Sequence, residues 1–156
     1  MPRKKRITKK VLFQKTVEIM QPILKLQDWK LIVVFSYSSR MKDTASCEAS
    51  PEYKLAKIKA NMNDISTLKH NEIVAVAIHE MIHCILWELG EWAETLSKKD
   101  TDKLELTRKY EEGAVTSFEK ILLPIVTDRL NEELYAQGYY GVDLTFTDFE
   151  IQHDRD

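Results

Sequence analysis

Two histidines and a glutamate stand at a spacing that suits catalysis with a metal ion. The run His79-Glu80-Met81-Ile82-His83 places the two imidazoles four residues apart. On an α-helix such residues share one face, with Cβ atoms about 5–6 Å apart, so both rings can bind one zinc ion. Glu80 points about 100° around the helix, where its carboxylate can take a proton from water held by the metal. The spacing predicts one Zn²⁺ per chain on His79 and His83, with Glu80 as the catalytic general base.

The surrounding sequence predicts that this motif lies on a helix in the protein interior. From Asn71 to Leu89 most positions are apolar, which is typical of a helix that packs on most of its faces. Two imidazoles and a carboxylate in such a setting are costly unless they are paired or bound to a metal. We therefore favour a zinc site over a histidine pair that is merely buried in the core. Gly90 follows and suits the left-handed residue that commonly ends a helix.

The third protein ligand is expected on a second helix, because a catalytic zinc commonly has three protein ligands and one open position. This helix should begin near Asp100 or Thr101 and reach Pro124. Its apolar stripe is expected to consist of Val115, Phe118, Leu122 and Ile125. Glu111 lies one turn before Val115 on this stripe, where a carboxylate needs a partner such as the metal. Glu111 is therefore the predicted third ligand, whereas the next residue, Glu112, is expected on the polar side.

The other elements predict an α+β fold, with a small twisted sheet packed on these two helices. Thr8 can cap a first helix that ends or bends near Pro22. The β-branched and aromatic residues of 29–37 predict a buried strand, and the polar residues 38–51 predict a turn. Residues 53–62 alternate with one slip in phase, which suggests a strand with a β-bulge, and the lysines of this strand are typical of a sheet edge.

Length and composition are those of one globular domain. The chain has 156 residues, 44% of them hydrophobic and 31% charged, which suffices for one core and not for two ordinary domains. Two cysteines are too few for a disulfide framework. We find no signal peptide and no run of 18 apolar residues, so we expect a cytoplasmic protein with no membrane segment.

The motifs together resemble the gluzincin class of zinc metallopeptidases. His79-Glu80-x-x-His83 is followed by a helix that contains Glu111-x-x-Ala114 and then Ile121-Leu122-Leu123-Pro124. This pattern is most similar to the ImmA/IrrE family and to small phage-encoded metallopeptidases, and the likeness covers about residues 29–124. The resemblance implies a minimal zincin-like fold and an intracellular zinc endopeptidase that acts on a protein or peptide substrate, often a repressor or another regulatory protein.

The resemblance also implies a place for the substrate. In such enzymes the edge strand of the sheet borders the cleft and binds an extended peptide by strand pairing. Here that strand would be the one at residues 53–62, with Ile58, Ala60 and Met62 as the substrate-binding residues. The domain would then cover residues 11–137, between a flexible basic arm at 1–10 and a tail of unassigned structure at 138–156.

Several alternatives stay open. The family pattern favours Asn or Asp where this chain has Val115, so the residues that orient the zinc-bound histidines are unidentified, with Glu112 and Asp64 as candidates. The residues of the zinc motif, His-Glu-Met-Ile-His, are also similar to the motif of SprT-like proteases, which act at DNA and use a third histidine as a ligand. A non-catalytic protein that keeps zinc for structure would instead have a fourth protein ligand.

Two smaller questions concern the chain ends and the oxyanion. Residues 1–10 carry six Lys or Arg and no acid. We favour a solvated terminus over a nucleic-acid contact there, because no aromatic side chain is present to stack on bases. The residues that could donate a hydrogen bond to the oxyanion are Tyr110, Tyr139, Tyr140 and His153, although core or surface packing is the expected role of each.

Overall fold

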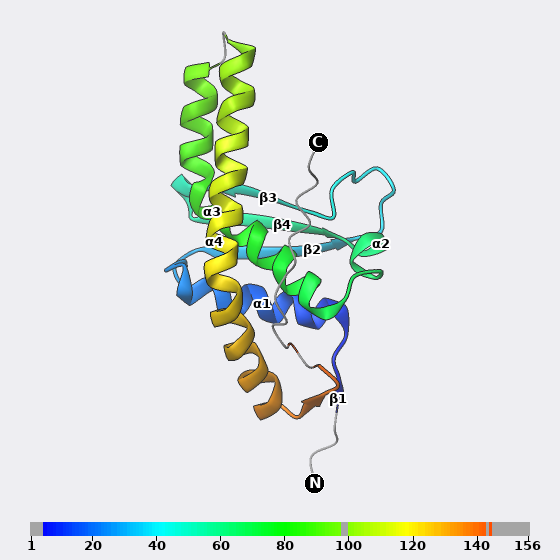
Figure 1. Ribbon diagram of the computed structural model, residues 1–156. Helices are drawn as coiled ribbons and strands as arrows, with labels where there is room; N and C mark the ends of the chain where they lie inside the picture. Colours follow the sequence, from blue (N-terminus) through cyan, green and yellow to red (C-terminus); the bar gives the residue numbers. More distant parts are fainter. Residues whose placement is uncertain (1–4, 98–99, 143, 145–156) are drawn as a thin grey trace.

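The computed structural model, which describes residues 5–97, 100–142 and 144, confirms the α+β class (Figure 1). The helices in this part of the chain are α1 (Lys9–Ile23), α2 (Met62–Ile65), α3 (His70–Ser97) and α4 (Thr101–Ala136). The strands β2 (Lys30–Ser36), β3 (Ala45–Ser50) and β4 (Leu55–Asn61) form a three-stranded sheet, and a 3-10 turn (Pro51–Tyr53) precedes β4. The short strands β1 (Lys5–Arg6) and β5 (Tyr139–Tyr140) form a separate pair.

β4 is the central strand of the sheet, which corrects two expectations. It pairs in parallel with β2 and antiparallel with β3, in unbroken register on both sides, so it is neither an edge nor bulged. Ala56, Ile58 and Ala60 are fully buried, and the alternation of a strand directs Lys57 and Lys59 to the opposite face. The lysines therefore lie on the solvent-exposed face of a sheet that is covered on one side only. Outward lysines occur both on such a face and at a sheet edge, so the sequence pattern cannot distinguish the two.

β2 and β3 are the two edge strands of the sheet, and β3 lies inside the segment predicted to be a turn. Its sequence Ala-Ser-Cys-Glu-Ala-Ser lacks the β-branched and aromatic residues that favour strands. It is stabilised by its full ladder with β4 and by the burial of Ala45 and Ala49. The opposite side of β3 pairs with no described strand, so it is a free edge of the sheet.

α3 is the central helix of the fold, as predicted, but it continues about two turns past its expected end. Its buried residues include Ile73, Val74, Ala77, Ile78, Met81 and Ile82. The helix runs through Gly90 to Ser97. Gly90 instead makes room for α4, because a Cβ at this position would lie 3.0 Å from Oε2 of Glu111.

The apolar character of α3 bears on the expectation of no membrane segment. Within His70–Thr95 a window of 18 residues has a mean hydropathy of 1.5, so this helix is long and apolar enough to cross a membrane by length and composition alone. In the structure 44% of that 18-residue window is buried against the rest of the chain. The core helix of a soluble protein has the same properties, so the length and hydropathy of α3 do not distinguish a core helix from a membrane-spanning one.

α3 and α4 form an antiparallel hairpin that projects well beyond the sheet (Figure 1). No described side chain is buried between Ile85 and Ala114, so the core reaches α4 only from Val115 onward. There the buried face carries Val115, Leu123, Val126, Leu130 and Leu134. Phe118 and Ile125, which were expected on the inner face, are nearly half exposed. The helix passes through Pro124, which is itself exposed.

The described parts of the two chain ends lie together. β1 of the basic segment pairs in parallel with β5, and α1 begins at Lys9 with Thr8 as its N-cap, as predicted. Nζ of Lys9 donates to the carbonyls of Ser66 and Leu68, so part of the basic charge binds the domain itself. The rest of the predicted arm and tail, including His153, lies outside the described residues.

Candidate metal centre

A cleft of about 590 Å³ lies between the free edge of the sheet and α4, and one face of α3 forms its floor. Asp43, Thr44, Ala45, Ser46 and Cys47 line it on the sheet side. His79, Glu80 and His83 come from α3, and Glu111, Glu112 and Glu119 from α4. The three residues of the sequence motif thus share the cleft with three further carboxylates. These carboxylates lie opposite the motif because α4 packs antiparallel to α3.

Two imidazole nitrogens and one carboxylate converge in this cleft. Nε2 of His79 and Nε2 of His83 are 3.2 Å apart. The carboxylate of Glu112 faces both, with Oε2 3.6 Å from Nε2 of His79 and Oε1 3.5 Å from Nε2 of His83. Among the described residues these three form the group whose ligand atoms all lie within 4.8 Å of one another.

These separations fit a zinc ion. Bonds of 2.0–2.2 Å in a tetrahedron place neighbouring ligand atoms roughly 3.3–3.6 Å apart, close to the distances in this group. Imidazole nitrogen and carboxylate oxygen are also donors that zinc accepts. No fourth His, Cys, Asp or Glu atom joins the group in the described part of the chain, so one position would stay open. An open position is the property of catalytic zinc sites, whereas structural sites are closed by protein ligands.

Each histidine has its own carboxylate behind the ring. Nδ1 of His79 lies 3.1 Å from Oε2 of Glu119, and Nδ1 of His83 lies 3.4 Å from Oε1 of Glu111. A proton held on Nδ1 by such a partner leaves the lone pair of Nε2 free for the metal. The pKa of His79 is raised, mainly because of the hydrogen bond with Glu119. This effect outweighs partial burial, which lowers the pKa.

The group of residues that could hold a metal differs in one member from the predicted ligands. Glu111 is the more buried carboxylate, as its place on the helix indicated, but it contacts the rear of His83 beside Gly90. Glu112 is more exposed, and its carboxylate reaches both Nε2 atoms. Burial along α4 indicates which carboxylates point into the protein but not which atoms of a neighbouring helix they meet. The assignment therefore needed the position of α3.

Glu119 was not selected from the sequence, although a signal for it exists. It lies seven residues after Glu112, so both are on one face of a helix, two turns apart. His79 and His83 on α3 are one turn apart on the facing surface. A pair of carboxylates at that spacing, opposite a pair of histidines, would have indicated a shared site.

Glu80 is buried beside the histidines and only 7% exposed. Burial raises the pKa of its carboxyl to about 7, with a smaller contribution in the same direction from the charges of Glu112 and Asp43, while His79 lowers it. A carboxylate with a pKa near neutrality can both accept and release a proton at physiological pH. The environment therefore suits Glu80 to the role of general base that the sequence predicts.

Two thiols lie next to this site. Sγ of Cys47 on β3 is 2.7 Å from Sγ of Cys84 on α3, and the thiol of Cys84 also donates to the carbonyl of Glu80. The contact with Cys84, together with burial, raises the pKa of Cys47 well above its ordinary value. The thiolate that a metal would bind is thus disfavoured at Cys47, although this residue lines the cleft.

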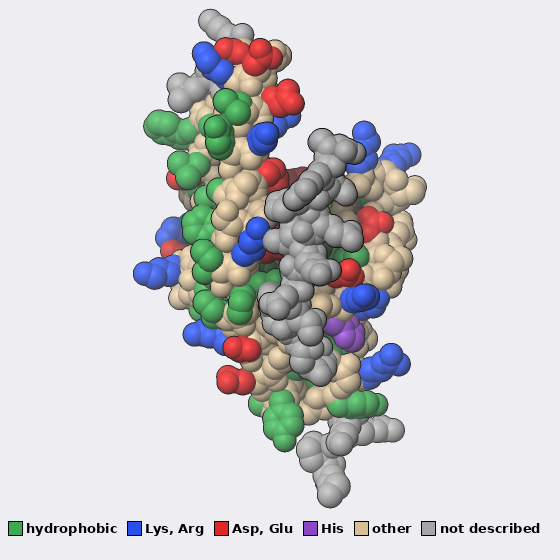
Figure 2. All heavy atoms as spheres, viewed as in Figure 1, with side chains coloured by type: hydrophobic (Ala, Val, Ile, Leu, Met, Phe, Trp, Pro, Cys, Tyr) green, Lys and Arg blue, Asp and Glu red, His purple; other side chains and the backbone are tan. Residues whose placement is uncertain are grey.

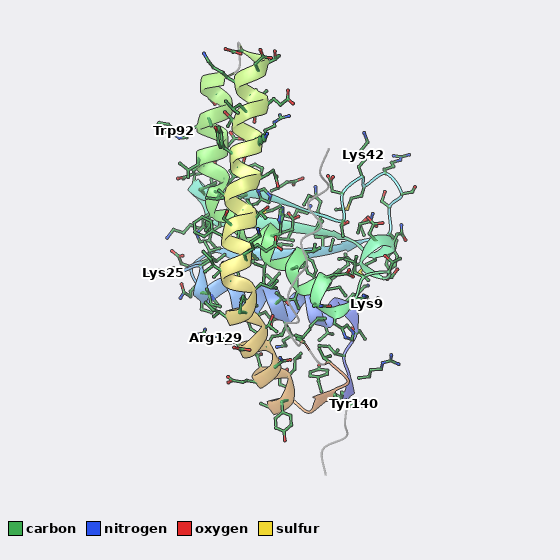
Figure 3. All side chains as sticks on the ribbon, in the orientation of Figure 1. Lys9, Lys25, Lys42, Trp92, Arg129 and Tyr140 are labelled. Atoms are coloured by element: carbon green, nitrogen blue, oxygen red, sulfur yellow. The ribbon has the colours of Figure 1, made fainter. Side chains whose placement is uncertain are left out.

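The remaining sequence candidates lie outside the cleft. Asp64 accepts a hydrogen bond from Asn61 at the start of α2, so it does not orient a histidine. Tyr110 is 71% exposed on α4, and Tyr139 and Tyr140 pair with β1. Tyr140 lies at the end of the molecule opposite to the tip of the hairpin (Figure 3). None of the described tyrosines lines the cleft.

The carboxylate behind His79 gives a first prediction. Replacing Glu119 by alanine should weaken zinc binding by about 10–100-fold, because the Nδ1 proton loses its acceptor and the ring its fixed orientation. Competition with a chromophoric chelator measures this affinity. Glu105→Ala, an exposed change on the same helix, should leave it unaltered. Equal affinities in the two variants would show that Glu119 does not support the metal centre.

Comparisons with protein-family models, with curated proteins and with solved structures found no match for this chain. A function therefore has to be inferred from the chemistry of the site itself.

Proposed function

We propose that this protein is a zinc-dependent endopeptidase, with the metal held by His79, His83 and Glu112. The observation that carries the proposal is the convergence of two Nε2 atoms and one carboxylate at the separations of a zinc coordination shell, beside a buried glutamate. Glu111, the ligand predicted from sequence, is then reassigned to orienting His83. The gluzincin and zincin-like resemblance of the sequence is part of this proposal.

The chemistry divides between the metal and Glu80. Zinc in this position would act as a Lewis acid on the peptide carbonyl and lower the pKa of water. Glu80 would accept a proton from the attacking water and then pass it to the amine of the departing peptide. Glu111 and Glu119 would hold the two imidazoles in one tautomer throughout. Glu80 is buried in a region of low dielectric, which would strengthen its attraction to the positive charge that develops on the departing amine.

The free edge of β3 supports a polypeptide substrate. Its residues Ala45, Ser46 and Cys47 line the cleft opposite the histidines. An extended peptide laid along this edge could form backbone hydrogen bonds with β3 and present a carbonyl to the metal centre. The substrate-binding role expected for Ile58, Ala60 and Met62 therefore moves to β3, because β4 has strands on both sides and Met62 belongs to α2.

Hydrolysis of an unfolded polypeptide tests the proposal. The purified protein, loaded with one equivalent of zinc, should cleave a reduced and unfolded protein or a peptide library, with products identified by mass spectrometry. A strong chelator should stop the cleavage, and zinc should restore it. If the protein bound one zinc ion tightly but cleaved no substrate, the result would contradict the proposed peptidase activity and favour a non-catalytic zinc protein.

Zinc should also stabilise the fold, because its proposed ligands come from both α3 and α4. At free zinc 1,000-fold above the Kd, binding adds about 4 kcal/mol, which corresponds to an increase of about 10 °C in Tm for a chain of this size. Thermal unfolding with and without a chelator measures the difference. His83→Ala is the control and should show little response to zinc. An unchanged midpoint in the native protein would mean that no metal connects the helices.

A further inference from the structure

The outward face of α4 carries a row of large apolar side chains that no described part of the chain buries. This row consists of Leu106, Tyr110, Phe118, Ile121 and Ile125, which are 45–71% exposed. At about 100° per residue they fall within an arc of about 120°, opposite the buried face that begins at Val115. Figure 2 shows hydrophobic side chains gathered along the hairpin on the face in view. A helix that is apolar on two opposite faces is expected to have a partner on each.

The row is large enough to be an interface. Fully exposed side chains of this kind present roughly 150–250 Å² each, so the observed exposures correspond to roughly 550 Å² on one copy. Two such surfaces facing each other would bury about 1,100 Å² before any flanking polar residue is counted. This area reaches the lower limit for specific protein association, and the roughly 550 Å² on one copy lies toward the upper end of the apolar patches that typical monomers expose.

The sequence of the row is complementary to its own reverse. About a midpoint between Val115 and Thr116, Leu106 lies as far to one side as Ile125 lies to the other. Tyr110 and Ile121 form a second such pair, and Gly113 and Phe118 form a third. Two copies of α4 packed antiparallel about a two-fold axis at this midpoint would therefore place apolar residues opposite apolar residues. They would also place each large Phe118 over a residue without a side chain.

The centre of the row has small residues where such helices would approach most closely. Gly113, Ala114 and Ser117 lie on either side of the midpoint. A Cβ at Gly113 would meet no atom within 4 Å, so nothing in the described chain requires glycine at this helical position. Glycine weakens a helix interior relative to alanine, and close approach of a second chain is a reason to have it there.

The charges at the two ends of the row also suit a second copy. Lys103 lies on the row near the tip of the hairpin, and Asp128 lies on it at the same distance beyond the midpoint. Both are exposed, and Lys103 contacts only its neighbour Asp100 among the described acids. In the antiparallel arrangement each Lys103 would face Asp128 of the other copy, at both ends of the interface. Opposite charges at symmetric positions favour this register over a parallel one.

We infer that the outward face of α4 is the interface of a two-fold homodimer of this chain. The area is sufficient for this interface, and the reverse complementarity of the apolar row and the opposite charges at its ends both fit one occupant, a second α4 in antiparallel orientation. Glu112 and Glu119 lie on the other side of the helix, so the cleft stays open in each copy. The dimer does not depend on the proposed peptidase activity.

Sedimentation velocity of the zinc-loaded protein, from about 1 to 500 μM, tests the inference. The native chain should pass from monomer toward dimer in this range. Ile121→Glu should raise the dissociation constant at least about 100-fold, because it would bury a charge opposite Tyr110. Leu89→Glu is the matched control: Leu89 is as exposed but lies on α3 outside the row, so dimerisation should persist. Far-UV circular dichroism and zinc content show that each variant is folded.

Charge exchange tests the register. Lys103→Asp should weaken the dimer, and the addition of Asp128→Lys in the same chain should restore it, since each end would again have opposite charges. A native protein that stays monomeric at all concentrations would overturn the inference. A dimer that Ile121→Glu leaves intact would overturn it equally, because the interface would then lie on another surface.

Discussion

Replacing Glu80 by glutamine should lower peptide hydrolysis by at least about 10²-fold while the protein stays folded and keeps its zinc. Glutamine preserves the shape and the hydrogen-bonding capacity of the side chain but cannot accept a proton from water. Because Glu80 lines the cleft without belonging to the group of converging ligand atoms, zinc affinity should be unchanged. Initial rates on a peptide found by library screening, together with metal analysis, measure both properties.

Glu88→Gln is the matched control for this change. Glu88 is on the same helix, two turns further on, and is exposed to solvent, so the substitution should leave the rate and the zinc content as they are. A glutamine variant at position 80 that cleaves as fast as the native protein would exclude Glu80 as the base. Loss of zinc in that variant would instead make Glu80 a metal ligand and contradict the ligand group of the structure.

Glu112→Ala should have the largest effect on zinc binding among the carboxylates of α4. It removes a ligand atom from a group of three, so we expect the affinity to fall by more than about 10²-fold, beyond the loss typical of a residue behind a ligand. Glu111→Ala should cost about 10–100-fold, since it removes the contact with Nδ1 of His83 and leaves all three ligand atoms in place. Chelator competition on the two variants ranks them.

The order of the zinc affinities of Glu111→Ala and Glu112→Ala decides which of the two glutamates is the metal ligand. If Glu111→Ala lost zinc more completely than Glu112→Ala, the sequence-based choice of Glu111 would be correct, and the side chains would have to rearrange when the metal binds. Gly90→Ala offers an independent check. Its Cβ would lie 3.0 Å from Oε2 of Glu111 and displace that carboxylate, and the three atoms nearest to this Cβ all belong to Glu111. It should therefore reproduce the smaller of the two losses.

The local elements with strong sequence signals were predicted correctly. The α+β class, the cap of α1 at Thr8, a strand at β2 and the start of α4 at Asp100 all follow from short-range chemistry, and the structure confirms them. β2 was expected to be buried, but its residues are half-buried or exposed. β3 was missed because its small and polar residues become a strand only when β4 offers a partner. The true end of α3 was missed because Gly90 suits a helix end, and only the approach of Glu111 gives it another role.

The sequence by itself determined the chemistry that this protein can offer. The spacing of His79, Glu80 and His83 on an apolar helix defines two possible metal ligands and a base, since a helix repeats its face every four residues regardless of its surroundings. Tertiary structure decided how the site is completed. The antiparallel packing of α4 on α3 determines which of three glutamates meets Nε2 and which meet Nδ1, and the pairing of β3 with β4 determines which strand borders the cleft. Helix rotation and strand order depend on contacts between distant segments, and the period of one segment carries no information about either.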